Sequence, residues 1–294
     1  ILSTLIGLLI GIARLSNNYL IAKLAGGYIE LFRNIPILLQ ILFWYNLFIN
    51  VFPHPKQSLA FFDIAFLNQR GLYLPKPIAE DGFIFVAIAF IIGIIAAYFI
   101  KKFFKKRHEL TGTHTSTWMY SLGLIVGLPV MVYFLVGSPL QFDYAVLGKF
   151  NLKGGMAVVP EFLALTFALS VYTATYIAEA IRSGIEAVDK GQKEAAAAIG
   201  LSPVQSLKLI VLPQALRVAI PPTINQYLNL TKNSSLATVI GYPELMSTFG
   251  GTVLNQVGQA VEILAMAMLV YLVISLFISL LLNYVNKKME IQGR

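Results

Sequence analysis

The sequence predicts an all-α membrane protein, a helical bundle that crosses a lipid bilayer about seven times. Its 294 residues are 57% hydrophobic and 12% charged, and the mean hydropathy is +0.73. Soluble globular domains carry roughly 25% charged residues, so about half that share favours a chain that lies in lipid. Seven stretches also approach the roughly 20 apolar residues that a membrane-spanning helix needs.

The seven expected spans differ in how clearly they can be recognised. They cover residues 1–15, 35–52, 83–100, 117–136, 157–181, 215–235 and 257–285. The first opens at Ile1, inside an apolar run, so we expect the protein to be truncated at its N-terminus. The sixth is unusually polar. Residues 17–33 carry Lys23 and Glu30, and we expect them to form a helix along the membrane surface that leads into the second span.

The distribution of Lys and Arg predicts how the spans are oriented. Cytoplasmic loops of membrane proteins are rich in these residues, and most of the 22 found here fall on one side when seven spans alternate in direction. This places residues 194–213 and the C-terminus in the cytoplasm. The net charge of +8 therefore needs no nucleic-acid partner. We expect the basic run 101–108 to anchor this topology, with a specific lipid-binding role as the alternative.

Several kinds of chemistry are excluded by what the sequence lacks. It contains no cysteine, which excludes disulfides, thiolate zinc sites and thiol catalysis. Its three histidines, His54, His108 and His114, are expected in loops and show no metal-binding or nucleophile–base spacing. We therefore expect no catalytic residue, no metal and no cofactor. The chain also lacks the phosphate loop G-x-x-x-x-G-K-[ST], so it is not expected to hydrolyse ATP itself.

The polar stretch 189–213 between two apolar segments predicts a rigid pair of short helices. Asp189 can cap a first helix with Gln192 at the third position, and Gly200 follows where a terminating glycine belongs. Ser202 can cap a second helix, with Pro203 at its first position. We expect that helix to end at Pro213. Such a knob suits the transmission of a push from a soluble partner to the membrane helices, although an ordinary ordered loop is the alternative.

The spacing within this stretch resembles a family motif. Glu194-Ala195-Ala196, three residues, Gly200, nine residues, Ile210, one residue and Leu212-Pro213 are similar to the EAA motif of ABC-transporter permease subunits. The resemblance implies a multi-span helical bundle of the type I importer permease (MetI-like) kind. It also implies that the motif couples to a separate ATP-binding subunit, which docks on Glu194 to Gly200.

Further stretches resemble one branch of that family, the polar amino-acid importers of the histidine, glutamine and glutamate type. They are residues 28–36 with Gln40, 176–185, 212–217 and 232–237. Residues 67–75 resemble the general L-amino-acid permeases within it. These resemblances imply import of L-amino acids across a bacterial inner membrane. They also imply a periplasmic amino-acid-binding protein and a second, unequal permease subunit as partners.

The resemblance also divides the chain into three expected regions. Residues 1–52 hold the first spans and the surface helix, and residues 157–290 form the core permease region with the hairpin 189–213. Residues 53–156 would be a family-variable insertion with two extra spans. Its flanking external loops, 53–82 and 137–160, are rich in Pro and Gly and show no clear fold of their own.

The polar sixth span is the expected substrate path. Asn225, Asn229 and Lys232 recur on one helix face, flanked by Gln226 and Asn233. Polar groups within a bilayer are costly and usually face a bundle interior or a water-filled path. Interhelical hydrogen bonding is the alternative. Pro221 and Pro222 should kink the helix.

Candidate carboxylates lie near the external ends of two other spans. Glu161 and Glu262 could meet the amino group of an amino acid, although such glutamates are more often solvated. Lys232 could pair with a substrate carboxylate or with an internal glutamate. The main alternative function is a secondary transporter or channel for small polar solutes. That class predicts carboxylates within the spans or an internal repeat, and the sequence shows neither.

Overall fold

The computed structural model describes residues 1–112, 116–148 and 151–289, so His114 lies outside the described part. The chain divides into two compact units. Unit 1 comprises Ile1–His54, Asn68–Leu72 and Val158–Arg294, and unit 2 comprises Pro55–Leu67 and Tyr73–Ala157.

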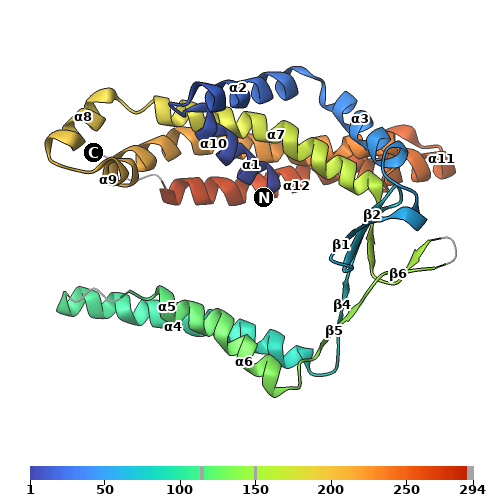
Figure 1. The fold of residues 1–294 in the computed structure, drawn as a ribbon, viewed down its shortest axis with the longest axis horizontal. Coiled ribbons are helices and arrows are strands. Elements are labelled where there is room, and N and C mark those ends of the chain that lie inside the picture. The colour runs from blue at the N-terminus through green and yellow to red at the C-terminus, as the bar shows by residue number, and fades with distance from the viewer. Residues whose placement is uncertain (113–115, 149–150, 290–294) are drawn as a thin grey trace. The chain divides into compact units, whose positions relative to one another are not determined.

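Unit 1 is a helical bundle organised around one long helix. Its α-helices are α1 (Leu2–Arg14), α2 (Tyr19–Asn34), α3 (Ile37–Asn50), α7 (Pro160–Glu186), α8 (Lys190–Ala198), α9 (Pro203–Ser206), α10 (Leu212–Asn233), α11 (Leu254–Val257) and α12 (Ala260–Met289). Three further helical segments join them: η3 (Leu207–Val211) and η5 (Ser247–Val253), which have the wide turns of a π-helix, and η4 (Ser234–Ile240), which has the tight turns of a 3₁₀ helix. Helix α7 packs against α1, α10, α3 and α2 (Figure 1).

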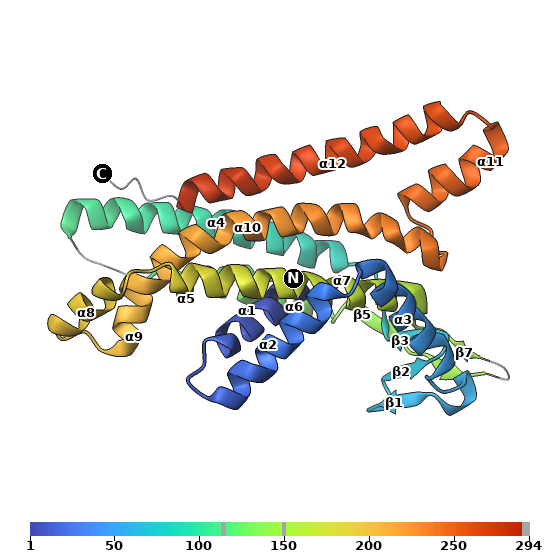
Figure 2. The same cartoon turned by 90° about the horizontal axis from the view of Figure 1, so that it is seen from above.

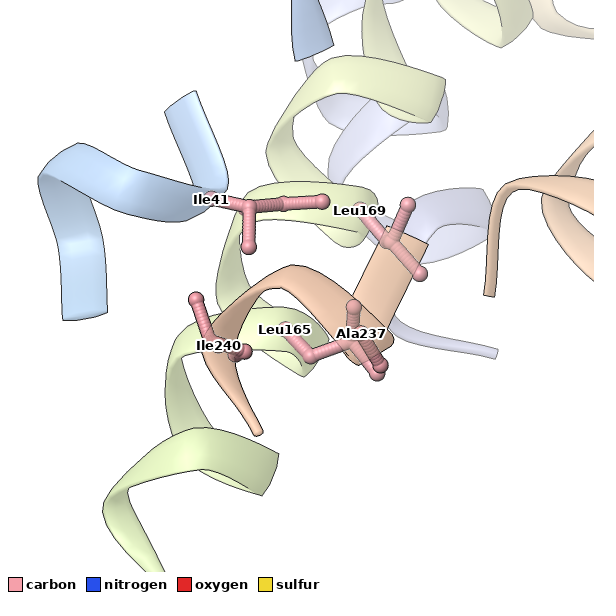
Figure 3. Packing of buried hydrophobic residues seen from close by; sticks show 6 residues of the cluster. Ile41, Leu165, Leu169, Ala237 and Ile240 are labelled. Atoms are coloured by element: carbon pink, nitrogen blue, oxygen red, sulfur yellow. The ribbon is translucent and has the colours of Figure 1, made fainter. Parts of the chain in front are cut away.

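Small residues let the neighbouring helices approach α7 closely. A Cβ added at Gly7 of α1 would lie 2.8 Å from the Ile177 Cβ, and one at Gly184 of α7 would lie 2.5 Å from the Ala215 carbonyl oxygen. Close backbone approach at small residues is the usual way helices pack in lipid. In the first half of α7, Leu165 and Leu169 meet Ile41 of α3 and Ala237 and Ile240 of η4 (Figure 3).

A sharp bend separates α2 from α3. The two helices are bent by 102° across Ile35 and Pro36. Proline cannot continue the α2 hydrogen-bond ladder. The buried Gln40 side chain donates to the Phe32 carbonyl at 2.7 Å and to the Ile35 carbonyl at 2.9 Å. One amide therefore satisfies two carbonyls at the end of α2 that the helix itself leaves unpaired.

Unit 2 contains a second helical hairpin. Its first limb is α4 (Phe83–Thr111), and the return limb comprises α5 (Trp118–Leu122), η2 (Gly123–Gly127) and α6 (Leu128–Leu135). Ala89, Gly93 and Ala97 are the buried residues of α4, and a Cβ added at Gly93 would lie 2.3 Å from the Leu124 carbonyl oxygen. His108 lies in the last turn of α4, so its expected place in a loop was wrong.

The expectation that the external loops lack a fold of their own was also wrong. A short 3₁₀ turn, η1 (Pro55–Gln57), precedes the strands, which are β1 (Leu59–Phe61), β2 (Ala65–Asn68), β3 (Gly71–Leu74), β4 (Lys76–Ala79), β5 (Leu140–Asp143), β6 (Val146–Leu147), β7 (Leu152–Lys153) and β8 (Met156–Val158). They form one sheet in the order β1-β2-β3-β8 and the antiparallel pairs β4–β5 and β6–β7. β4 pairs with β5 across more than sixty residues of chain, and no local pattern reveals such a partner.

Helices lie at all seven positions where spans are expected, but not all of them are long enough to cross a membrane. Among the described residues, five helical segments are long and apolar enough to cross a membrane, or six if the bent pair α2–α3 is counted as one span. Helix α1 is apolar but has 13 residues, shorter than a full span. The fold is therefore a multi-span helical bundle.

Candidate functional site

The first limb of the predicted coupling hairpin is a short helix with well-defined ends. The Asp189 carboxylate accepts a hydrogen bond of 2.6 Å from the Gly191 N–H, which caps α8. The Gln192 N–H donates to the Asp189 backbone carbonyl and not to the Asp189 carboxylate. At the other end Gly200 has φ +79°, the Leu201 N–H bonds the Ala196 carbonyl, and the Gly200 N–H bonds the Ala197 carbonyl. This pair of bonds is the Schellman motif, and it confirms the terminating glycine.

The second limb begins as expected but does not end as expected. The Ser202 hydroxyl accepts from the Gln205 N–H, and the Gln205 side chain accepts from the Ser202 N–H, which confirms the capping box. The predicted stop at Pro213 was wrong, because α9, η3, α10 and η4 form one continuous helical segment, Pro203–Ile240. The wide turns of η3 directly precede Pro213, which has no N–H to donate.

The continuous segment also runs through Pro221 and Pro222, which lie inside α10. The two prolines leave the carbonyls of Arg217 and Val218 without their usual helical donors. The hairpin of α8 and α9 lies beyond the end of α7 (Figures 1 and 2). A force applied to it therefore reaches the polar helix without an intervening loop.

The hairpin packs through its base and leaves its tip open. Val188, Val211 and Ala215 form a buried cluster at the base, and Ala196 is the only buried residue of the described α8. A cavity of about 350 Å³ lies between the limbs, lined in part by Lys193 and Leu207. The motif residues Glu194, Ala195 and Gly200 are exposed. Ile210 is half-buried, Leu212 is exposed, and Pro213 is half-buried.

A charged cluster holds the end of α7 next to the hairpin. Arg182 Nη2 lies 2.5 Å from Glu179 Oε1. Arg182 also pairs with Glu186, a partner that the sequence analysis did not identify. The Arg33 guanidinium of α2 stacks 5.2 Å from the centre of the Tyr176 ring. The Arg33 side chain therefore joins α2 to α7, while the Arg182 pairs lie within α7.

The polar face of α10 is open within this chain. Asn225, Asn229 and Lys232 are exposed, and Gln226 and Asn233 are half-buried. Their helix packs through other residues: Ile224 is buried, and the Tyr227 hydroxyl lies 2.7 Å from the Thr4 hydroxyl of α1. Among the described residues, Lys232 has no carboxylate partner. An internal glutamate is therefore not its partner within the described chain.

Comparison with known proteins decides the family. The sequence profile of the binding-protein-dependent transport system inner membrane components matches residues 89–291. The chain belongs to this family. It is a permease subunit of the ABC type, which is the inner membrane component of such a transport system.

The permease is similar along almost its whole length to curated relatives. It is 52% identical over 292 residues to the general L-amino acid transport system permease protein AapQ of Rhizobium johnstonii, covering 99% of this chain and 73% of that one. It is 50% identical over 294 residues to the putative amino-acid ABC transporter permease protein YhdX of Escherichia coli, covering 100% of this chain and 75% of that one. It is 40% identical to the permease protein BztB of Rhodobacter capsulatus, covering 96% and 73%.

A solved structure shares the fold of the permease. The crystal structure of an amino acid ABC transporter with histidines matches at a TM-score of 0.54 and 19% identity. The match covers 98% of this chain and 85% of that one.

The two candidate carboxylates of the permease lie in different surroundings. Glu161, in the first turn of α7, accepts a hydrogen bond of 3.2 Å from the Tyr45 hydroxyl of α3. Glu262, in the first turn of α12, is exposed. The hydrogen bonds of the described residues connect neither of them to the amides of α10.

One carboxylate with several hydrogen-bond partners was not predicted from the sequence. Glu244, in the turn after η4, accepts from the Tyr271 hydroxyl at 2.7 Å, from the Ser247 and Met246 N–H groups at 2.7 and 2.8 Å, and from the Thr238 hydroxyl. Burial raises the pKa of Glu244, but these donors outweigh it and hold the pKa below its ordinary value. The signal available in the sequence was a lone glutamate after Gly241 and Pro243, between two apolar stretches.

Proposed function

We propose that this permease subunit imports L-amino acids across a bacterial inner membrane and forms half of the translocation path. The observation that carries the proposal is the capped hairpin of α8 and α9, which continues without a break into the polar helix α10. The names of the relatives support the substrate class, because AapQ is a general L-amino acid permease and YhdX a putative amino-acid permease.

ATP hydrolysis in a separate subunit would drive this import. We propose that the ATP-binding subunit docks on Glu194 to Gly200 and that Ile210, Leu212 and Pro213 connect the docked hairpin to the membrane. Exposed apolar side chains at the tip support this assignment: Ile199 is 76% exposed and Val204 is 59% exposed. Exposed apolar side chains that gather at one place outside the bilayer suit a protein contact. The Schellman motif and the capping box make the hairpin stiff enough to transmit a push.

The remaining partners complete the path. A second, unequal permease subunit would face the open side of α10, and a periplasmic amino-acid-binding protein would deliver the substrate. We place the hairpin and the C-terminus in the cytoplasm, on the Lys and Arg distribution. In the three-part organisation that we propose, residues 1–52 and 157–290 form the core permease and residues 53–156 are an insertion with two extra spans.

The substrate would pass along the polar face of α10. Asn225, Asn229 and Lys232 are exposed there, and the prolines free two backbone carbonyls close by. Lys232 supplies the positive charge that a substrate carboxylate needs, and Gln226 and Asn233 flank the polar face. Glu161, with its Tyr45 hydrogen bond, and Glu262 are candidates for the amino group of the substrate at the outer ends of their helices.

Uptake of radiolabelled amino acids into proteoliposomes tests this function. We expect uptake only when the permease is reconstituted with its ATP-binding subunit, its second permease and its binding protein, and only with ATP. Uptake by this chain alone, driven by an ion gradient, would show the alternative function of a secondary transporter.

One substitution tests the docking surface separately. Ala198→Arg places a long charged side chain on the exposed surface of α8, and we expect it to abolish ATP-driven uptake while the protein still inserts in the membrane. Ala187→Arg, at an exposed position after α7, is the matched control. Equal uptake by the two variants would contradict docking on α8.

A further inference from the structure

Unit 2 contains a cavity between the two limbs of its helical hairpin. The cavity has a volume of about 450 Å³. Lys101 of α4 lines it, together with Thr117, Trp118, Ser121, Leu122 and Ile125 of the return limb. Neither the coupling hairpin nor the polar face of α10 includes any of these residues.

The residues that line the cavity are polar on one side and apolar on the other. Lys101, the Thr117 hydroxyl and the Trp118 indole N–H are donors, whereas the Ser121 hydroxyl already donates to the Thr117 carbonyl at 3.0 Å and can only accept. Leu122 and Ile125 supply an apolar wall one turn further along the helix. The cavity therefore suits a ligand with an anionic group at one end and hydrocarbon at the other.

The length of α4 places this cavity at the membrane surface. At 1.5 Å per residue, Lys101 lies about 27 Å along the helix from Phe83, close to the roughly 30 Å thickness of the hydrocarbon layer. The apolar part of α4 fills that length, and the basic run 101–108 follows it. Trp118 and Tyr120 of α5 are 60% and 54% exposed, as is usual for aromatic residues at the level of the lipid headgroups.

The local charge favours an anion from that layer. The run contains Lys101, Lys102, Lys105, Lys106 and Arg107, and all five are exposed. Glu109 lies 4.0 Å from Lys105, with both side chains largely exposed, so this pair removes little of the positive charge. Lys101 has no carboxylate partner among the described residues. Its ammonium group is therefore available to an anion in the cavity.

We propose that this cavity binds an anionic glycerophospholipid from the surrounding bilayer. Lys101 pairs with the phosphodiester, and the Thr117 hydroxyl and the Trp118 indole supply hydrogen-bond donors beside it. The first carbons of an acyl chain run along Leu122 and Ile125. The basic run attracts anionic lipids in general, whereas the cavity selects one lipid and holds it between α4 and α5.

The fluorescence of Trp118 provides a direct test in the full chain. The sequence has 2 tryptophans, so Trp44→Phe leaves Trp118 as the sole reporter. The variant is reconstituted into phosphatidylcholine vesicles that contain phosphatidylglycerol brominated on its acyl chains, or brominated phosphatidylcholine. We expect brominated phosphatidylglycerol to quench Trp118 at a mole fraction about fivefold lower than brominated phosphatidylcholine.

Two charge-matched variants separate the cavity from the basic run. Lys101→Gln should remove the preference for phosphatidylglycerol, whereas Lys102→Gln, one residue away and outside the cavity lining, should retain it. An equal loss in both variants would show diffuse attraction to the basic run and would overturn the proposal. Equal quenching by the two brominated lipids in the Trp44→Phe chain, with every residue of the basic run unchanged, would overturn the proposal as well.

Soluble competitors distinguish a lipid from other anions. We expect the quenching preference to persist in millimolar inorganic phosphate or glycerol 3-phosphate and in the presence of an oligoglutamate peptide. Loss of the preference with phosphate would show a site for free phosphate, and loss with the peptide would show a site for an acidic protein segment. Either result would contradict the lipid assignment.

Discussion

The Tyr271 hydroxyl of α12 donates a hydrogen bond of 2.7 Å to Glu244, in the turn after η4. The same carboxylate accepts from the Met246 and Ser247 N–H groups and from the Thr238 hydroxyl. Glu244 therefore joins three parts of the permease. They are η4, the start of η5 and the last long helix, α12. Of these, η4 packs on α7. We expect it to stabilise the C-terminal half of unit 1.

Replacing Glu244 by Gln should destabilise the permease in a way that depends on pH. A glutamine side chain has one carbonyl oxygen where the carboxylate has two acceptors, so some of the four donors lose their partner, at a cost of roughly 1–3 kcal/mol. Because hydrogen bonds lower the pKa of Glu244 from the ordinary 4.5, the carboxylate stabilises the fold above that ordinary value. This contribution is lost as the pH falls through the lowered pKa of the folded state.

Thermal unfolding of the purified permease, measured from neutral pH downwards, checks this prediction. The difference in midpoint between the wild type and Glu244→Gln should shrink in acid. Glu30→Gln, at an exposed carboxylate of α2, serves as the control and should leave the midpoint unchanged. A difference that is constant over the whole pH range would mean that Glu244 acts through packing and not through its charge.

Gly200 should tolerate asparagine but not valine. Its φ is +79°, and an added Cβ would meet nothing of this chain within 4 Å, so the backbone conformation decides how a substitution affects the end of α8. The left-handed conformation costs roughly 1–2 kcal/mol for a residue with a Cβ, and asparagine adopts it more readily than other residues. We expect Gly200→Val to loosen the end of α8 and to reduce ATP-driven uptake, while the chain still inserts in the membrane.

The Asn variant makes the Gly200 experiment decisive. Uptake by Gly200→Asn should stay close to that of the wild type, because the Schellman bonds of Gly200 and Leu201 can still form. If both variants transported normally, the rigid end of α8 would have no part in coupling.

Local signals in the sequence predicted the hairpin well, because caps and terminating glycines act over three or four residues. Asp189, Ser202 and Gly200 all occupy the predicted positions. The expected stop at Pro213 was wrong because proline usually ends a helix, whereas here the wide turns of η3 come just before it and the helical segment continues past it.

Long-range contacts could not be predicted in the same way. Two of the groups that donate to Glu244 are the hydroxyls of Thr238 and Tyr271. Tyr271 lies 27 residues after Glu244, and nothing in the sequence marks either residue as its partner. The strands of unit 2 pose the same problem, since β4 and β5 are separated by the whole helical hairpin. The expected site at α10 rests on periodicity, which places residues on one face but does not say which carboxylates approach that face.

Gly93 should not tolerate even a methyl group. A Cβ at this position would lie 2.3 Å from the Leu124 carbonyl oxygen, so the backbone of η2 would have to move away from α4. Overpacking of this kind typically costs about 1–3 kcal/mol. We expect Gly93→Ala to lower the unfolding midpoint of the purified permease. Gly123→Ala, in the same hairpin but with nothing within 4 Å of the added Cβ, should leave it unchanged, and an equal fall would contradict close packing at Gly93.

Lys232 should affect substrate affinity more than assembly. A hydrogen bond to a charged group contributes roughly 1.5–3 kcal/mol, so we expect Lys232→Gln to raise the KM of uptake about tenfold or more. Assembly with the second permease and the ATP-binding subunit should be unchanged, as judged by co-purification. Leu216→Ala changes an exposed residue on the opposite side of α10 and is the control. If Lys232→Gln instead reduced co-purification of the second permease and left KM unchanged, the polar face would hold the two subunits together and would not line the substrate path.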